Sequence, residues 1–266
     1  MPRRNVIVAG FFLVCLSLMV AACQSPQVTP TTEPTLAAPT AAPPTPVPTV
    51  PPERTLVVCL GQEPTTLYMY GSASRSMWSV LEAVYDGPFD TREYSAQPVI
   101  LEKMPSLADG DVQITPVTVR AGDEVVDSSG NLATLGQGTL VLPSGCSSPG
   151  CAVAYDGASE ISLDQMNVTF RIKPGVQWSD GAPVTAADSV FSYTVAASAD
   201  TPVSKRLIDR TADYKAVDDS TVQWTGKPGF RYSRYFTNFW LPLPQHQLGS
   251  VSAADLMTNT DAGENP

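Results

Sequence analysis

Apolar and polar residues alternate most regularly between Met166 and Lys173. The apolar positions are Met166, Val168, Phe170 and Ile172, and the polar positions are Asn167, Thr169, Arg171 and Lys173. Because successive side chains of a strand point to opposite faces of a sheet, this alternation predicts a half-buried β-strand.

Two turns and a helix are predicted directly after this strand. Residues 174–175 are Pro-Gly and residues 179–181 are Ser-Asp-Gly, and both sequences are typical of turns. Thr185 with Asp188 three residues later is typical of a capped helix start, and Pro202 marks the expected limit of the helix. The side expected to be buried consists of Val190, Phe191, Thr194 and Val195.

Shorter patterns predict the remaining elements. The apolar run Thr55–Leu60 predicts a buried strand, in which Cys59 would be a buried, unreactive thiol. Apolar residues at helical spacing predict an amphipathic helix over 74–85. The runs 214–217 and 221–224 predict a hairpin. The other expected elements are strands at 112–120, 124–126 and 139–142 and a short helix at 251–257.

The first 22 residues are predicted to be a secretory signal. Arg3 and Arg4 precede an uncharged apolar run from Val6 to Val20, which is too short and wrongly flanked for a stable membrane-spanning helix. The small residues before Cys23 are similar to the lipobox of bacterial lipoproteins, in which the cysteine thiol receives diacylglycerol. Cys23 is therefore the expected lipidation site. The alternative is an ordinary signal peptide with a chance cysteine.

The segment after the signal, 23–53, is predicted to be a linker. Ten of the thirty residues from 24 to 53 are proline, and much of the rest is threonine and alanine. Proline removes backbone donors and favours polyproline II, so the segment cannot build a packed core. Its greatest reach is about 90 Å, at about 3.1 Å per residue. We expect it to hold a folded domain away from a membrane surface.

Charge and cysteine content narrow the class of protein. The chain has 16 Lys and Arg against 26 Asp and Glu, a net charge of −10, which disfavours nucleic acid as a partner. Cys146 and Cys151 flank the turn-rich sequence Ser-Ser-Pro-Gly, so a small disulfide loop is expected outside the cytoplasm. A zinc site is the alternative, although two thiols and one distant histidine make a poor tetrahedral set.

Sequence motifs for catalysis are missing. A serine hydrolase needs a histidine base near its nucleophile, and no serine lies in a Gly-x-Ser-x-Gly sequence. The sequence also contains no His-Glu-x-x-His motif and no phosphate-binding loop of the Walker type. We therefore expect a protein that is not an enzyme and that needs no cofactor.

The segment from 169 to 191 resembles a signature of the family 5 extracellular solute-binding proteins, the oligopeptide-, dipeptide- and nickel-binding lipoproteins of bacterial ABC importers. The resemblance rests on Thr-Phe-Arg-Ile-Lys-Pro-Gly-Val at 169–176, Trp-Ser-Asp-Gly at 178–181 and Pro-Val-Thr-Ala-Ala-Asp-Ser-Val-Phe at 183–191. Further similar segments follow in the family's order, at 61–67, 217–222 and 243–246. The longest departure lies between Gly122 and Gly157.

This resemblance implies a fold and a set of domains. The fold class would be α/β (α+β), an incomplete lobe like those of type II periplasmic binding proteins with a small β-rich accessory domain. The first lobe would begin with 54–95 and resume at 211–266, and the accessory domain would be 96–210. Family members continue into a second lobe, so we expect the chain to be the N-terminal portion of a binding protein.

The resemblance also implies a function. Such a protein captures peptides or related solutes outside the membrane and delivers them to the permease and ATPase subunits of an ABC importer. It would be extracytoplasmic and anchored to the cell membrane by its N-terminal lipid. The alternative classes are a lipid-tethered structural or adhesion module without small-molecule binding, and a secreted hydrolase.

Gln62, Glu63 and Tyr85 are the candidate ligand-binding residues. Gln62 and Glu63 follow the first predicted strand, and open α/β sheets bind ligands at the carboxyl ends of their strands. Tyr85 and Trp78 would offer aromatic surfaces, although core packing is the favoured interpretation for both. A structural role is expected for Trp178 and Asp180 in the signature turn and for the single histidine.

Overall fold

The structure is a computed structural model that describes residues 55–85 and 87–264. The predicted signal, the linker and the lipidation site at Cys23 lie outside the described residues. Residues Val57–Pro266 form one compact unit. Within the described ranges, no helix has the length and apolar character needed to span a bilayer.

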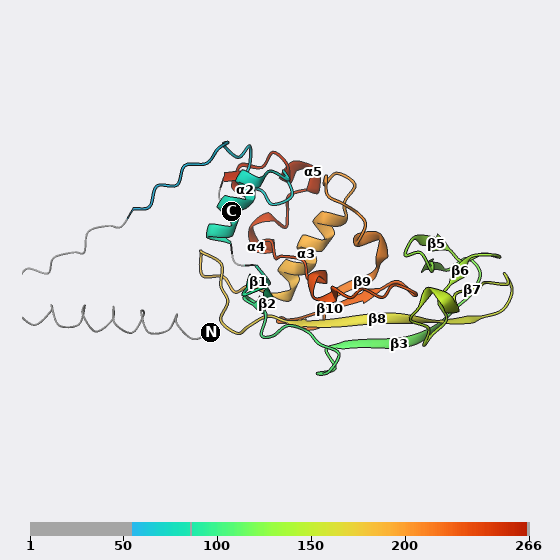
Figure 1. Cartoon of the computed structure of the whole chain (residues 1–266). Helices are drawn as coiled ribbons and strands as arrows, with labels where there is room; N and C mark the ends of the chain where they lie inside the picture. Colours follow the sequence, from blue (N-terminus) through green and yellow to red (C-terminus); the bar gives the residue numbers. More distant parts are fainter. Residues whose placement is uncertain (1–54, 86, 265–266) are drawn as a thin grey trace, which may run out of the picture. The chain divides into compact units, whose positions relative to one another are not determined.

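A four-stranded antiparallel sheet runs along one side of the compact unit, with helix α3 (Ala186–Ala197) above it in the view of Figure 1. The strand order of the sheet is β3 (Val112–Val119), β8 (Ile161–Arg171), β10 (Thr221–Gly226) and β9 (Thr211–Ala216). The alternation predicted for β8 is confirmed, with Met166, Val168 and Phe170 buried. The strand starts five residues earlier than predicted, because it pairs with β3 as far as Ile161. The predicted hairpin is confirmed as β9–β10.

Helix α3 packs against β9 and β10. Its predicted start is confirmed, because Asp188 accepts a hydrogen bond from the Thr185 backbone N–H at 2.8 Å in a capping box. The predicted buried side is wrong in part, since Thr194 is exposed. The most buried positions are mainly small residues, which allow close approach to the sheet: Ala186, Asp188, Ser189, Ser192, Val195 and Ala196.

The other helices surround a second apolar core. Helix α2 (Arg75–Val84) confirms the predicted amphipathic helix and buries Met77 and Leu81. The short helices are α4 (Gln245–Leu248), α5 (Ala253–Leu256) and α6 (Thr260–Glu264). They join α2 around a buried cluster that includes Leu248, Leu256 and Ala262. The 3₁₀ helices are η1 (Pro149–Cys151), η2 (Ile208–Arg210) and η3 (Tyr235–Asn238).

Three small hairpins complete the described fold. They are β1 (Phe89–Arg92) with β2 (Ser95–Pro98), β4 (Glu124–Val126) with β5 (Leu132–Thr134), and β6 (Leu140–Val141) with β7 (Val153–Ala154). The last two lie at the end of the long strands β3 and β8 (Figure 1) and enclose a third core with Val125, Leu135 and Leu163. The mixed α/β class predicted from the sequence is confirmed.

The predictions for the first apolar run are wrong. Thr55–Leu60 forms no strand, and Val57 and Val58 are 79% and 67% exposed. Cys59 is an exposed free cysteine and not a buried one. The physical reason is that the sheets of the described residues provide this run with no partner strand.

The domain boundaries predicted at 95 and 210 stay predictions. Strand β8 precedes residue 210 and strands β9 and β10 follow it, yet all three belong to one sheet. This pairing counts against a separation at 210.

Candidate functional site

A groove on the compact unit is the main candidate for a binding site. It consists of two adjoining hollows, with volumes of about 290 and about 490 Å³, that share Met69, Tyr70, Trp78, Val203 and Ser204. The first hollow is completed by Ala196, Leu207, Ile208, Thr237, Phe239, Trp240 and Leu241, and the second by Gly71, Ser72, Ala73 and Pro202. Three separate parts of the chain therefore build the wall.

Helix α2 and the loop before it provide the first part. Ser74 caps the helix by accepting a hydrogen bond from the Met77 backbone N–H at 3.2 Å. Burial of Met77 and Leu81 fixes the orientation of the helix and leaves Trp78 39% exposed in the groove. The Tyr70 hydroxyl lies 2.7 Å from the Ser192 hydroxyl, which ties the loop to α3.

The loop after α3 provides the second part. The Thr201 hydroxyl donates to the Val195 carbonyl at 2.6 Å, and Thr201 is buried. The Lys205 ammonium group donates to the carbonyls of Ala196, Ser198 and Thr201 at 2.5, 2.5 and 3.0 Å. These bonds fold the loop back onto the end of α3 and so place its side chains in the groove.

The segment after η3 provides the third part. The Trp240 backbone N–H donates to the Tyr214 hydroxyl at 3.0 Å, and the Ser189 hydroxyl donates to the Trp240 carbonyl. The Trp240 ring packs edge-on against Tyr193 and Tyr214, with ring centroids 4.7 and 4.9 Å apart. The segment is therefore held against α3 and β9, which gives this side of the groove a rigid aromatic surface.

The groove wall carries no formal charge. Among its lining residues, all in the described ranges, there is no Asp, Glu, Lys, Arg or His. Among the described lining residues, Tyr70 is the one with an ionisable side chain. Burial raises the pKa of its hydroxyl to about 12, and the hydrogen bond with Ser192 lowers this pKa by a smaller amount. The wall is thus uncharged at neutral pH and offers apolar and aromatic contacts with a few hydroxyl groups.

None of the three predicted ligand residues lines this groove. Gln62 and Glu63 are exposed and line neither it nor the hollow beside Tyr85. Tyr85 lines that separate hollow, of about 170 Å³, together with Val84 and Trp178. Its hydroxyl donates to the Pro242 carbonyl at 3.0 Å, and burial raises its pKa. The structure does not bring the three residues together.

Trp78 lines the groove with a partly exposed side chain. Core packing was the favoured prediction for it, and an aromatic surface at the ligand site was the alternative. The other main groove residues, Met69, Tyr70, Val203 and Ser204, were not predicted at all. The sequence carries no local pattern for them, because they become neighbours only through the packing of α2 against α3.

The signature turn is connected to α4 by polar contacts. Asp180 accepts hydrogen bonds from the Ala182 backbone N–H at 2.9 Å and from the Gln247 side chain at 2.9 Å, and His246 Nε2 lies 2.8 Å from it. The Ala182 N–H, followed by His246 and Gln247, lowers the Asp180 pKa to about 2. These contacts support the structural role expected for this turn.

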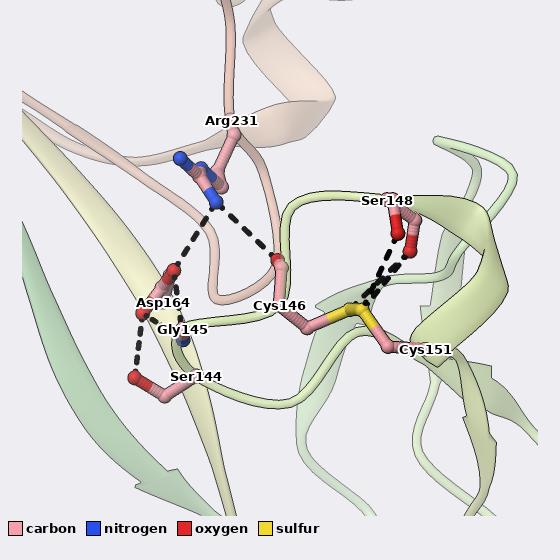
Figure 2. Close-up of polar contacts among 7 residues, drawn as sticks. All are labelled: Ser144, Gly145, Cys146, Ser148, Cys151, Asp164 and Arg231. Carbon is pink, nitrogen blue, oxygen red and sulfur yellow. Dashed lines mark hydrogen bonds and ion pairs between the residues drawn. A yellow bond between two sulfur atoms is a disulfide. The ribbon is translucent and has the colours of Figure 1, made fainter.

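A disulfide joins Cys146 to Cys151, with a Cα–Cα distance of 6.1 Å (Figure 2). The buried Asp164 carboxylate of β8 accepts a hydrogen bond from the Ser144 hydroxyl at 2.6 Å. Arg231 Nη1 lies 3.5 Å from the same carboxylate and donates to the Cys146 carbonyl at 3.3 Å. Figure 2 shows how these groups tie the disulfide loop to β8 and to the segment after β10. Within the described residues, no group of three or more His, Cys, Asp or Glu residues is placed to hold a metal ion.

Comparison with known proteins gives a match over the C-terminal part of the chain. Residues 148–265 match the sequence profile of the bacterial extracellular solute-binding proteins, family 5 Middle. This range extends from η1 to α6 and includes the predicted signature. A search of curated proteins gave no match.

Solved structures of oligopeptide-binding proteins are similar at low identity. One, from Thermus thermophilus in complex with a pentapeptide, has 16% identity over 69% of this chain and 23% of its own, with a TM-score of 0.46. Another, AppA from Bacillus subtilis in complex with a nonapeptide, has 20% identity over 76% of this chain and 30% of its own, with a TM-score of 0.47. The chain spans less than a third of the length of either protein.

The family's description is of binding proteins that act outside the cell, and it names no catalytic activity. The match to its profile includes the strand, turn and helix on which the sequence resemblance rests. Residues 148–265 are therefore similar to the bacterial extracellular solute-binding proteins of family 5.

Proposed function

We propose that this chain takes part in capturing a peptide or related solute outside the cytoplasmic membrane and in delivering it to the permease and ATPase of an ABC importer. The match of residues 148–265 to the family 5 solute-binding proteins carries this proposal. Two of the similar solved proteins contain a bound peptide. The open groove with exposed Trp78 supports it, since partly apolar concave surfaces with a few polar groups suit small ligands.

Binding would be non-covalent and would leave the ligand unchanged. Extended peptides are held mainly through backbone hydrogen bonds, while pockets or grooves receive their side chains. In this chain, Tyr70, Trp78 and Trp240 would contact ligand side chains. Gln62 and Glu63, which lie outside the groove, would meet other parts of the ligand, Glu63 its amine. Tyr85 lines the separate hollow and would take no part in this binding.

The proposed location is the outer side of the membrane, with the lipid on Cys23 as the anchor. The proline-rich segment that follows would hold the compact unit at a distance from the bilayer. Replacing Cys23 with serine should release the chain from the membrane fraction of expressing cells. A variant that stays in the membrane fraction would rule out this anchor.

Calorimetric titration of a pool of tri- to nonapeptides into the purified chain tests the proposed function. Because an open groove covers only one side of a ligand, we expect a dissociation constant on the order of 0.1–1 mM. The Trp78→Ala variant should lose most of the binding heat. Val84→Ala, on the same helix but in the separate hollow beside Tyr85, should keep it.

Two results would count against this account. The absence of binding heat at millimolar peptide would reject the proposed function for this chain. Equal binding by Trp78→Ala and the unchanged chain would reject the groove as its site.

A further inference from the structure

The uncharged wall of the groove makes it a poor site for charged groups of a ligand. A charged group of a ligand loses water when it enters a groove, and this loss is offset only by an opposite charge or by several hydrogen bonds. The lining residues provide no opposite charge. The Tyr70 hydroxyl is already hydrogen-bonded to Ser192, at 2.7 Å.

Arg75 and Arg206 lie close to the groove along the chain and are exposed, but they are not among its lining residues. Two other cations close along the chain, Lys205 and Arg210, are already engaged. Lys205 follows the lining residue Ser204, and its ammonium group is shared among three carbonyls. Arg210 lies two residues after the lining residue Ile208, and its guanidinium donates to the carbonyls of Gly130 and Arg206. Both side chains would have to break these contacts before they could meet an anionic ligand.

The aromatic surface of the groove favours apolar and aromatic ligand groups over charged ones. Trp78 is partly exposed, and Trp240 lies on the same wall with its ring held by Tyr193 and Tyr214. Covering these rings removes apolar surface from water, and for Trp240 the cost in side-chain entropy is small because its ring is already held.

We propose that the groove selects an uncharged apolar or aromatic segment of a peptide-like ligand and disfavours acidic and basic side chains. This inference rests on the proposed function and adds to it the chemical class of the bound segment. The indoles of Trp78 and Trp240 receive the ligand group, and the small residues Gly71, Ser72 and Ala73 leave space beside Trp78.

Blocked tripeptides test this selectivity without contributions from charged peptide ends. The probes are N-acetylated, C-amidated Ala-Phe-Ala, Ala-Leu-Ala, Ala-Glu-Ala and Ala-Lys-Ala, titrated into the purified chain with ¹⁵N-labelled tryptophan. The chain has four tryptophans, of which Trp78 and Trp240 line the groove, Trp178 lines the other hollow and Trp224 is fully buried.

The Phe and Leu peptides should shift the indole N–H signals of Trp78 and Trp240 and leave those of Trp178 and Trp224 unchanged. Their affinity should exceed that of the Glu and Lys peptides at least about tenfold. Trp78→Ala should abolish the Trp240 shift, and Val84→Ala should preserve it.

The possible failures are distinguishable. If the Glu or Lys peptide binds in the groove as tightly as the Phe peptide, the inferred selectivity is wrong and the proposed function stands. If none of the four blocked peptides and no free peptide of the pool shifts any of the four tryptophan signals, both the selectivity and the proposed function are wrong. A shift confined to Trp178 would place the ligand in the hollow beside Tyr85 and would also overturn the inference.

Discussion

Lys205 holds the loop that follows α3 against the end of that helix. Its three acceptors include the carbonyls of Ala196, in the last turn, and of Ser198, the C-cap residue. A cation is favoured at this end of a helix, where carbonyl groups lack partners within the helix. The loop that it holds contributes Pro202, Val203 and Ser204 to the groove.

The Lys205→Met variant keeps the aliphatic stem and removes these three hydrogen bonds. We expect the backbone N–H groups of Thr201 and Val203, which donate to Ser198 and Thr201, to exchange with solvent at least about tenfold faster. The free energy of unfolding should fall by about 1–3 kcal/mol. Amide hydrogen exchange followed by mass spectrometry measures the first effect.

Lys215→Met is the matched control, because among the described residues the Lys215 ammonium group pairs only with the exposed Asp213 of the same strand. It should leave the exchange of the loop unchanged. If Lys205→Met also leaves it unchanged, the loop is held by other contacts, and Lys205 does not have this role.

Asp180 makes the stability of the signature turn depend on pH. Its pKa is lowered to about 2, whereas a free aspartate has a pKa of about 3.9. A lowered pKa means that the folded state favours the carboxylate, so its contribution is fully present above about pH 4 and disappears as the pH falls towards 2. The difference in thermal midpoint between the unchanged chain and Asp180→Asn should therefore shrink over this range. A difference that stays constant from pH 5 to 2 would contradict this explanation.

At the scale of single elements, periodicity predicted the long ones well. The alternation in β8 and the capping residues of α3 are local patterns that the chain follows. The buried side of α3 was mispredicted because apolar character was weighed above size. Ser189 and Ser192 are buried there, since small hydroxyl side chains fit close to neighbouring elements and find partners in Tyr214 and Tyr70.

Other elements depend on information that the local sequence lacks. The hairpin β1–β2 was missed because its strands are short and largely exposed, so they show no apolar alternation. The run Thr55–Leu60 has the composition of a strand, but strand formation needs a neighbour for its hydrogen bonds. Pairing partners are a property of the folded chain.

Gly229 shows how closely the segment after β10 approaches β4. Its φ is +86°, and a Cβ atom added there would lie within 2.3 Å of the Val126 carbonyl oxygen. Its backbone N–H donates to the Asp164 carbonyl at 2.8 Å. We expect Gly229→Ala to lower the free energy of unfolding by about 3 kcal/mol, through the positive φ and the clash with the backbone. Urea denaturation measures this loss.

Gly110 offers the control for this substitution. Its φ is +76°, and no atom lies within 4 Å of an added Cβ. Gly110→Ala should therefore lower the free energy of unfolding by only about 1 kcal/mol, because only the positive φ is unfavourable there. Equal losses for the two variants would show that the contact with β4 is unimportant.

At the scale of the whole molecule, the class of protein was more predictable than its binding site. The signature at 169–191 is contiguous and specific, and it lies within the range that matches the family. The groove is built from residues near 69–78, 196–208 and 237–241, which no local pattern connects. Gln62 and Glu63 were chosen because ligands lie at strand ends, and the strand on which that choice depended is not formed.

Photo-crosslinking of a bound peptide tests the central claim, that the groove containing Trp78 is a ligand site, most directly. The probe is a blocked Ala-Ala-Ala tripeptide with benzophenone-alanine replacing the central residue, irradiated with the chain, and the adducts are located by mass spectrometry after proteolysis. We predict adducts on Met69 and on residues 202–208, and their loss in the presence of excess Ala-Phe-Ala peptide. Adducts confined to residues 176–184 or to the hairpins between 120 and 155, or no adducts that the competitor removes, would contradict the account.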